Sequence, residues 1–354
     1  DSQRSQRAMV GRTAALALVL MLVQNSGFVL VMRYSRHQQQ REHAAQYSPA
    51  VVVVMQELFK LAVCFVATAV QQSGRAALHT LGQRAEVVRV LVPAACFTLQ
   101  NNVLYVALSN LEPLVFQVTY QIKTLLTALI SVQLLGRSLS RWQWLSQATL
   151  TLGVILAQLD DGEAAKRPQV AEQSLLTGLL AVLAAAASSS YASVYFERLL
   201  KERTRLPVDD EHDGGPPQSP SLWQRNMHLC ILTCPMNLML ALTQVGGGSS
   251  VWRAPLHGFE ASTWGIVAVN GMGGLLVAVV MKYADNILKG FATAGALILT
   301  GLLAPLLGLS PAPGVMLLLG GVLVVGSLFL YAHAPPARPI VTIMAEAQTL
   351  KDKL

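Results

Sequence analysis

Two lysines stand beside amides and a tyrosine, inside or next to long apolar runs of the sequence. Lys123 follows Gln117 and Tyr120 at helical spacing, so the three side chains lie on adjacent turns, and Lys289 follows Asn286 in the same way. A lysine at the centre of a membrane helix costs roughly 2.5–3.5 kcal/mol, which favours a functional role. Because an unpaired ammonium binds anions, the pattern predicts a midplane site for a phosphorylated, hydrogen-bonding solute of charge about −2.

Simpler interpretations exist for each of these charges. Lys123 could pair with the carboxylate of Glu57 on another helix, and Lys289 could be an ordinary basic residue flanking a membrane span. Glu57 and Lys60 are three residues apart, so they share one helix face and could neutralise each other. The sequence leaves open whether that pair is structural or part of a site.

Three consecutive amides, Gln100, Asn101 and Asn102, interrupt another apolar run. Successive residues of a helix point in different directions, so the three cannot all face lipid. We therefore expect at least one of them to face another helix or an aqueous cavity, and we add Asn101 and Asn102 to the candidate site.

Features of enzymes, metal sites and nucleic-acid binders are weak in this sequence. It contains no HExxH, GxSxG or P-loop motif, so we expect no catalytic residues and no cofactor. The four cysteines lie in apolar runs without a CxxC pair, which argues against a metal site. The net charge of +7 comes mostly from residues between the apolar runs and does not form one basic face, so we expect no nucleic-acid partner.

The elements that carry these side chains are long apolar segments. Hydrophobic residues make up 53% of the 354 residues and charged residues 13%, which indicates a membrane protein with the lipid bilayer as its surroundings. The segments do not alternate apolar and polar residues, so helices are expected. Cutting at polar, proline and glycine breaks predicts ten transmembrane helices, near 13–32, 49–70, 87–108, 114–135, 142–159, 174–197, 223–245, 262–281, 288–308 and 314–332.

The distribution of basic residues predicts the orientation. With Lys60 and Lys123 set aside, eighteen lysines and arginines fall on the side of the N-terminus and six on the other side, so both termini should be cytosolic. Five spans on each side of the 160–173 loop would make an inverted repeat, a plan of many secondary transporters. The predicted organisation is a cytosolic segment 1–12, a first half 13–159, a lumenal connection 160–173, a second half 174–332 with a flexible cytosolic loop 198–222, and a cytosolic tail 333–354.

Six motifs in a fixed order give this sequence a specific resemblance. They are Thr98-Leu-Gln-Asn-Asn102, Tyr105-Val-Ala-Leu-Ser-Asn-Leu111, Gln117-Val-Thr-Tyr-Gln-Ile-Lys123, Val194-Tyr-Phe-Glu197, Trp223-Gln-Arg-Asn226 and Lys282-Tyr-Ala-Asp-Asn-Ile-Leu-Lys-Gly-Phe291. With them the chain resembles, from about residue 24 to 331, the nucleotide-sugar transporters of the Golgi. Within the drug/metabolite transporter superfamily, it is similar to the branch that carries UDP-N-acetylglucosamine, UDP-galactose and CMP-sialic acid.

The resemblance implies a fold, an activity and roles for residues. It implies ten helices in a 5+5 inverted repeat, located in the Golgi membrane, with the ER membrane as the alternative. It also implies that the protein exchanges a cytosolic nucleotide sugar for the lumenal nucleoside monophosphate. It further implies that phosphate is held by Lys123 and Lys289, that the nucleotide is lined by Asn101, Tyr120 and Asn226, and that Glu57 and Lys60 lie towards the sugar. Whether the carrier associates with a second copy or with a glycosyltransferase stays open.

Two glycines that the family usually has on the sixth helix are replaced here. The segment reads Ser189-Ser190-Tyr191-Ala192-Ser193, with Ser190 and Ser193 in the glycine positions. If those glycines let a nucleobase lie against bare backbone, the serines would narrow that wall, so we include Ser189, Ser190 and Ser193 among the candidate substrate-binding residues.

The Met32-Arg-Tyr-Ser-Arg36 segment and Ala284 look more like the UDP-sugar carriers than the CMP-sialic acid carrier. We rank UDP-N-acetylglucosamine first, UDP-galactose second, and CMP-sialic acid exchange for CMP as the alternative. A membrane-embedded transferase would also gather lysines and amides around a nucleotide, but it would need a catalytic carboxylate or metal site that the sequence does not offer.

Overall fold

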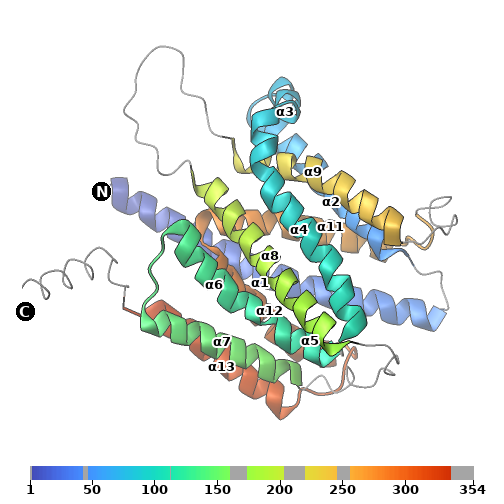
Figure 1. Cartoon of the computed structure of the whole chain (residues 1–354), viewed down its shortest axis with the longest axis vertical. Coiled ribbons are helices and arrows are strands. Elements are labelled where there is room, and N and C mark those ends of the chain that lie inside the picture. The colour runs from blue at the N-terminus through green and yellow to red at the C-terminus, as the bar shows by residue number, and fades with distance from the viewer. Residues whose placement is uncertain are drawn as a thin grey trace, which may run out of the picture.

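The computed structural model describes residues 2–42, 47–111, 113–159, 174–202, 220–244 and 256–335. Within these ranges the chain forms α-helices and no strands, arranged as one bundle (Figure 1). The helices are α1 (Ser2–Glu42), α2 (Pro49–Gln71), α3 (Gly74–Leu81), α4 (Arg84–Asn110), α5 (Pro113–Tyr120), α6 (Ile122–Leu135), α7 (Arg141–Leu159), α8 (Leu175–Lys201), α9 (Leu222–Gln244), α11 (Ala261–Tyr283), α12 (Asn286–Leu306) and α13 (Val315–His333).

A helix overlaps each of the ten predicted spans. Among the described residues, eight segments are long and apolar enough to cross a membrane: Gly11–Tyr34, Val51–Gln71, Arg84–Leu108, Val115–Leu135, Leu175–Lys201, Ala261–Tyr283, Asn286–Leu306 and Val315–His333. The predicted spans on α7 and α9 are less apolar because they carry polar side chains that face the protein, such as the buried Gln147, Arg225 and His228. The described part of the chain is therefore all-helical, with eight candidate membrane-spanning helices, as expected of a membrane protein.

The fourth predicted span is two helices, with a break at Gln121 between α5 and α6. The Gln121 amide donates to the Val118 carbonyl at 3.2 Å, and the Thr124 amide donates to the Gln121 carbonyl at 3.0 Å. Both bonds join residues three apart, so the chain tightens to a 3₁₀ turn here, a feature that often marks a functional hinge. The turn separates two candidate site residues, Tyr120 and Lys123.

Other helix boundaries also differ from the sequence prediction. The short helix α3 was not predicted, and α1 extends well beyond both ends of the 13–32 span. Helix α8 continues through Lys201, so the first residues of the predicted 198–222 loop are helical. Most of that loop, the 160–173 connection and most of the 333–354 tail lie outside the described residues.

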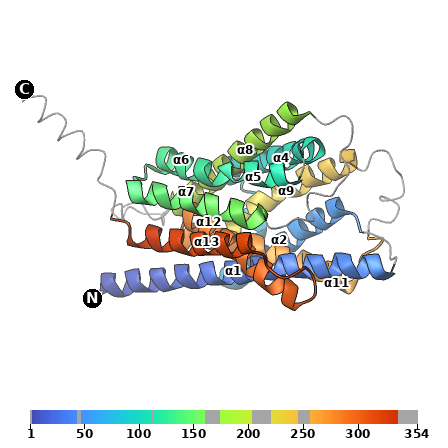
Figure 2. The ribbon, with the colours of Figure 1, turned by 90° about the horizontal axis from the view of Figure 1, so that it is seen from below.

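Helices α7 and α13 run alongside each other at the edge of the bundle (Figures 1 and 2), and glycines allow them to approach closely. A Cβ added at Gly320 would lie 2.7 Å from the Ala157 backbone nitrogen and 2.9 Å from the Ala157 Cβ. The hydroxyl of Ser146 also donates to the Ser327 carbonyl at 2.8 Å across this contact. Within lipid, no hydrophobic effect drives helices together, so their association depends on close van der Waals packing. Small residues allow that packing because they let the two backbones approach.

Replacing Gly320 by alanine should lower the thermal unfolding temperature of the detergent-purified protein by several degrees. The added methyl group must push α7 away, and overpacking of this kind costs about 1–3 kcal/mol. The matched control is Gly326→Ala on the same helix, where an added Cβ meets no atom within 4 Å. Equal unfolding temperatures for the two variants would contradict the close packing of α7 against α13.

Candidate functional site

A cavity of about 630 Å³ lies between α1, α5, α7, α11, α12 and the start of α13. It follows α1 from Met21 to Arg33 and α12 from Lys289 to Gly301, a length of about 18 Å on each helix at 1.5 Å per residue. The other residues that line it are Asn25, Phe28, Val29, Gln117, Ala157, Gln158, Val277, Thr293, Ala296, Leu297, Thr300, Ser310, Pro311, Ala312, Pro313 and Leu317. Its size is in the range of small-molecule sites.

The two ends of this cavity differ. One end is lined by the largely exposed 310–313 segment, which connects α12 to α13 at the surface of the bundle, and we call this end the mouth. The other end is at Lys289, in the first turn of α12. The described residues that line the cavity include two charged ones, Arg33 at the mouth and Lys289 at the inner end, and both are cationic. The cavity is therefore suited to an anion.

Lys123 adds a second cation near the inner end. Its Nζ lies 5.3 Å from the ring centre of Tyr120, and Tyr120 stacks on Phe116 with 5.6 Å between ring centres. Electrostatic repulsion acts between Lys123 and Lys289. Neither lysine has a carboxylate within ion-pair distance among the described residues, so Lys123 does not pair with Glu57 as the simpler interpretation would require.

Three amides of the cavity wall make no hydrogen bond to the described part of the chain. They are Asn25 of α1, Gln117 of α5 and Gln158 of α7, and the Gln158 Oε1 atom is buried without a partner. A buried amide atom without a partner is costly unless a ligand or water satisfies it, so Gln158, with the half-buried Asn25 and Gln117 on the same wall, favours a polar ligand in the cavity. Gln117 and Lys289 are predicted from the sequence, whereas Asn25, Arg33 and Gln158 are not, although both amides lie within predicted spans.

Ser190 fixes the backbone that carries Lys123. Its hydroxyl donates to the Lys123 carbonyl at 3.1 Å and accepts a bond from the Thr127 hydroxyl at 3.0 Å, and the Ser190 side chain is completely buried. These contacts direct it at α6. They favour a role for Ser190 in positioning Lys123. The role expected from the resemblance, as part of a wall against the nucleobase, is less favoured. Ser189 and Ser193 are also buried on α8.

Removing the Ser190 hydroxyl should weaken binding of the nucleoside monophosphate that the resemblance implies by about two- to tenfold, the range that the loss of one hydrogen bond gives. The change is Ser190→Ala, measured by calorimetry with UMP. The matched control is Ser189→Ala, an equally buried neighbour on the same helix. Equal affinities of the two variants would contradict the positioning role.

Glu57 and Lys60 form the ion pair that their spacing predicted. The Lys60 Nζ lies 2.5 Å from Glu57 Oε1, and the Thr233 hydroxyl of α9 donates to Glu57 Oε2 at 2.6 Å. Lys60 also lies against α11, where a Cβ added at Gly274 would be 3.0 Å from its Cδ atom. The pair joins three helices and is not among the residues that line the cavity.

The remaining predicted amides lie away from the cavity lining. Asn102 is exposed on α4, where its Nδ2 donates to the Thr98 carbonyl at 3.0 Å. Asn101 is half-buried on the same helix. Asn226 is buried on α9 and donates to the Leu222 carbonyl at 2.8 Å. Of the three, Asn102 is the least suited to contact a ligand inside the bundle.

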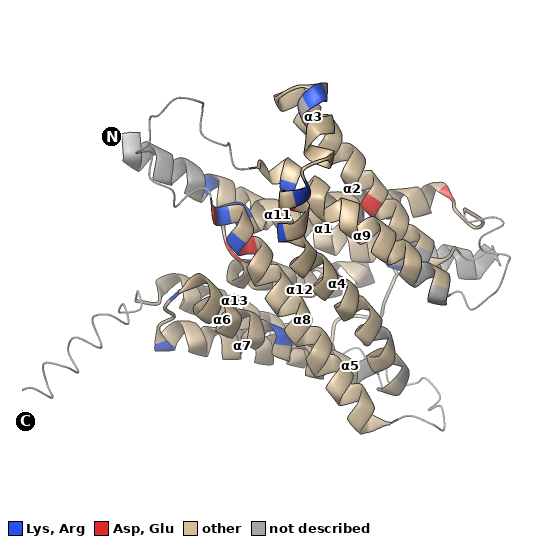
Figure 3. Ribbon diagram, turned by 45° about the horizontal axis from the view of Figure 1, so that its top comes forward, with Lys and Arg blue, Asp and Glu red and all other residues tan. Residues whose placement is uncertain are grey.

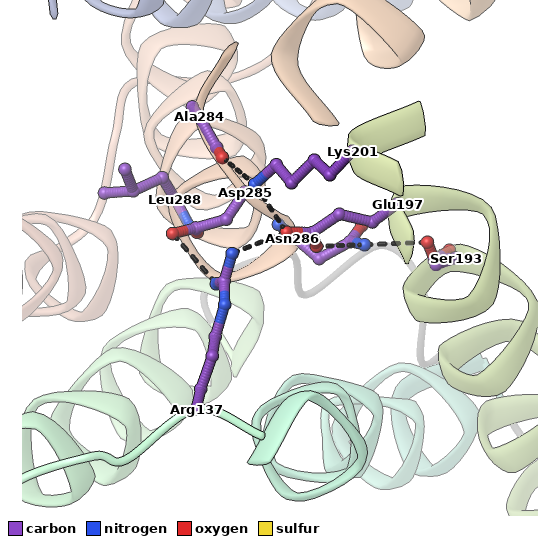
Figure 4. Close-up of polar contacts among 8 residues, drawn as sticks. All are labelled: Arg137, Ser193, Glu197, Lys201, Ala284, Asp285, Asn286 and Leu288. Atoms are coloured by element: carbon purple, nitrogen blue, oxygen red, sulfur yellow. Dashed lines mark hydrogen bonds and ion pairs between the residues drawn. The ribbon is translucent and has the colours of Figure 1, made fainter. Parts of the chain in front are cut away.

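Beyond the inner end of the cavity, a buried ionic cluster joins three segments (Figure 4). Glu197 of α8 is completely buried, and its Oε1 accepts from Arg137 at 2.6 Å and from Lys201 at 2.8 Å. Its Oε2 accepts from the backbone amide of Asn286 at 3.0 Å and from the Asn286 side chain at 2.8 Å. Asp285 pairs with Arg137 at 3.0 Å and caps α12. We call Arg137, Glu197, Lys201, Asp285 and Asn286 the Glu197 cluster.

The residues of the site are suited to binding a polar anion. In the described ranges no group of three or more histidine, cysteine or acidic side chains could hold a metal ion. The buried carboxylates are committed to ion pairs, as the Glu57 and Glu197 contacts demonstrate. Two lysines, uncommitted amides and a cavity that opens at one end suit recognition of a phosphorylated solute.

Comparisons with known proteins agree with this chemistry. The family model for "Nucleotide-sugar transporter" matches residues 12–332. A rat UDP-N-acetylglucosamine transporter is 36% identical over 90% of this chain and 95% of its own length. A human UDP-galactose translocator is 37% identical over 91% of this chain and 77% of its own length. A solved crystal structure with 19% identity shares the fold, at a TM-score of 0.64 over 90% of this chain and 96% of that one. The chain therefore belongs to the nucleotide-sugar transporter family.

Proposed function

We propose that this protein exchanges a cytosolic UDP-sugar for lumenal UMP across the Golgi membrane by alternating access. UDP-N-acetylglucosamine is the first candidate and UDP-galactose the second, because relatives of both names match the chain at 36–37% identity. The proposal applies the family's transport activity to the cavity that ends at Lys289.

The charge of the site carries this proposal. In the Glu197 cluster, Arg137 and Lys201 balance Glu197 and Asp285, so the cluster is neutral. Lys123 and Lys289 are left without carboxylate partners among the described residues. Two unneutralised ammonium groups are matched by a ligand of charge about −2, which both a UDP-sugar and fully ionised UMP carry.

We also propose the ten-span, 5+5 inverted repeat for this chain, and the helix packing supports it. If α1, α2, α4, α6 and α7 correspond in order to α8, α9, α11, α12 and α13, each major contact has a counterpart. The contact of α1 with α11 corresponds to that of α8 with α4, and α1 with α12 corresponds to α8 with α6. The contacts of α2 with α9 and of α7 with α13 lie on the symmetry axis.

The proposed orientation puts both termini and the Glu197 cluster on the cytosolic side. Figure 3 shows that most of the ribbon carries no charged residues. The basic residues at the ends of α6, α8 and α11 belong to the side with the greater lysine and arginine content. In this orientation the cavity mouth faces the lumen.

Counterflow in liposomes tests the proposal. Purified protein is reconstituted with UMP inside, and uptake of labelled UDP-N-acetylglucosamine, UDP-galactose and CMP-sialic acid is measured in parallel. We expect uptake of a UDP-sugar that requires internal UMP and leaves the sugar nucleotide chemically intact. Uptake of CMP-sialic acid alone, driven by CMP, would assign the protein to the alternative substrate. Cleavage of the labelled nucleotide sugar would instead indicate a transferase.

A further inference from the structure

The Glu197 cluster holds together parts of the chain that lie far apart in sequence. Arg137 follows α6 in the first half, Glu197 and Lys201 end α8, and Asp285 and Asn286 begin α12. Figure 4 shows Arg137 reaching across to the acidic side chains of the other two segments. Lys201 adds a bond to the Ala284 carbonyl just before α12. The cluster therefore joins the two halves at the end of the cavity opposite the mouth.

The burial of this cluster makes its bonds strong. Glu197 is fully buried, while Arg137 and Lys201 keep about a quarter of their side-chain surface exposed, at 24% and 26%. Charge-assisted hydrogen bonds are roughly twice as strong as neutral ones, and removing one partner leaves the other charge buried and unpaired. Separating α8 from α12 at this point would expose all of these groups at once.

The cluster is also linked to Lys289, one of the two lysines proposed to hold phosphate. Lys289 lies in the first turn of α12, where its backbone amide donates to the Asp285 carbonyl at 3.0 Å. Asn286, one turn before Lys289 on α12, donates to Glu197 Oε2 through both its backbone amide and its side chain. An anion bound at Lys289 that shifts the first turn of α12 would therefore also strain the bonds that hold α12 to α8.

We infer that the Glu197 cluster is a latch that keeps the inner end of the cavity closed while the carrier is empty. This inference rests on the proposed exchange function and deepens it, because it assigns Glu197 as a positioning residue that acts through α12 and Lys289. The latch opens readily only when an anion binds at the lysines. Exchange is then coupled, since the empty protein does not reorient and does not leak substrate.

Glu197→Gln and Arg137→Gln test the latch in liposomes loaded with labelled UMP. Two rates are measured for each variant: efflux with UDP-sugar outside, and efflux into buffer alone. We expect efflux into buffer to rise about tenfold or more in both variants, so that the ratio of coupled to uncoupled efflux collapses. The matched controls are Glu202→Gln and Arg198→Gln, which alter exposed charges beside the cluster and should leave the ratio unchanged.

The outcomes separate the latch from the exchange function itself. If the wild-type protein shows no exchange, the proposed function fails. If the wild type exchanges, and both cluster variants bind UMP and keep the wild-type efflux ratio, the latch is overturned. Should Glu197→Gln fail to fold, Arg137→Gln decides, because it leaves Glu197 paired with Lys201 and Asn286. A purely structural cluster would lower protein yield without changing the efflux ratio of the folded fraction.

Discussion

Replacing Lys289 by glutamine is expected to weaken UMP binding by at least about tenfold. The change removes an ammonium group at the inner end of the cavity, where no carboxylate among the described residues lies within ion-pair distance of it. A hydrogen bond to a charged group contributes about 1.5–3 kcal/mol, and 1.4 kcal/mol corresponds to a factor of ten in affinity. Calorimetry with UMP on the purified variant measures the loss directly. Lys123→Gln should show a loss of the same order.

Lys282→Gln is the matched control for this prediction. Lys282 is also a lysine at the end of a membrane helix, and its Nζ lies 5.3 Å from the ring centre of Tyr283, much as Lys123 lies over Tyr120. It does not line the cavity, so its replacement should leave UMP affinity unchanged. Wild-type affinity in a folded Lys289→Gln variant would show that the phosphate binds elsewhere.

The sequence predicts the helices well because each must be apolar over a membrane-spanning length. Lysines and amides inside such a segment are costly, so the sequence alone points to Lys289 and Gln117 as candidates, and both line the cavity. The ion pair of Glu57 with Lys60 could be predicted for a similar reason, since residues three apart share a helix face. These predictions use only the local chain.

The rotation of each helix about its axis was harder to predict. Ser190 was expected at the nucleobase wall, yet its hydroxyl contacts the Lys123 carbonyl on α6. Asn102 was expected inside the bundle but is exposed on α4. Tertiary packing decides which face of a helix points inward, and helices with polar residues on several faces do not specify it themselves.

The Glu197 cluster could not be assembled from sequence because its members come from three separate segments. Arg137 and Lys201 looked like ordinary basic residues on the cytosolic side, where many lysines and arginines lie for topological reasons. Glu197 and Asp285 stood in motifs of the resemblance without an assigned role. Their partnership becomes visible only when α8 packs near the start of α12.

Removing Glu57 or Lys60 alone is expected to impair UDP-sugar counterflow more than removing both. A single change leaves one buried charge unpaired, at a cost of about 3–5 kcal/mol, whereas the double variant leaves a neutral site. The Thr233 hydroxyl partly compensates Lys60→Met, because it already donates to Glu57 at 2.6 Å. Lys60→Met should therefore be the milder of the two single changes.

Glu57→Gln and Lys60→Met, singly and together, form a double-mutant cycle read by counterflow and by UMP affinity. The pair belongs to α2 and is not among the residues that line the cavity, so UMP affinity should change less than UDP-sugar transport. Thr233→Val, which removes one neutral donor to Glu57, serves as the control for general damage at this contact. Additive losses would show that the two charges act independently. Equal losses of UMP binding and of UDP-sugar transport would place the pair at the nucleotide and not at the sugar.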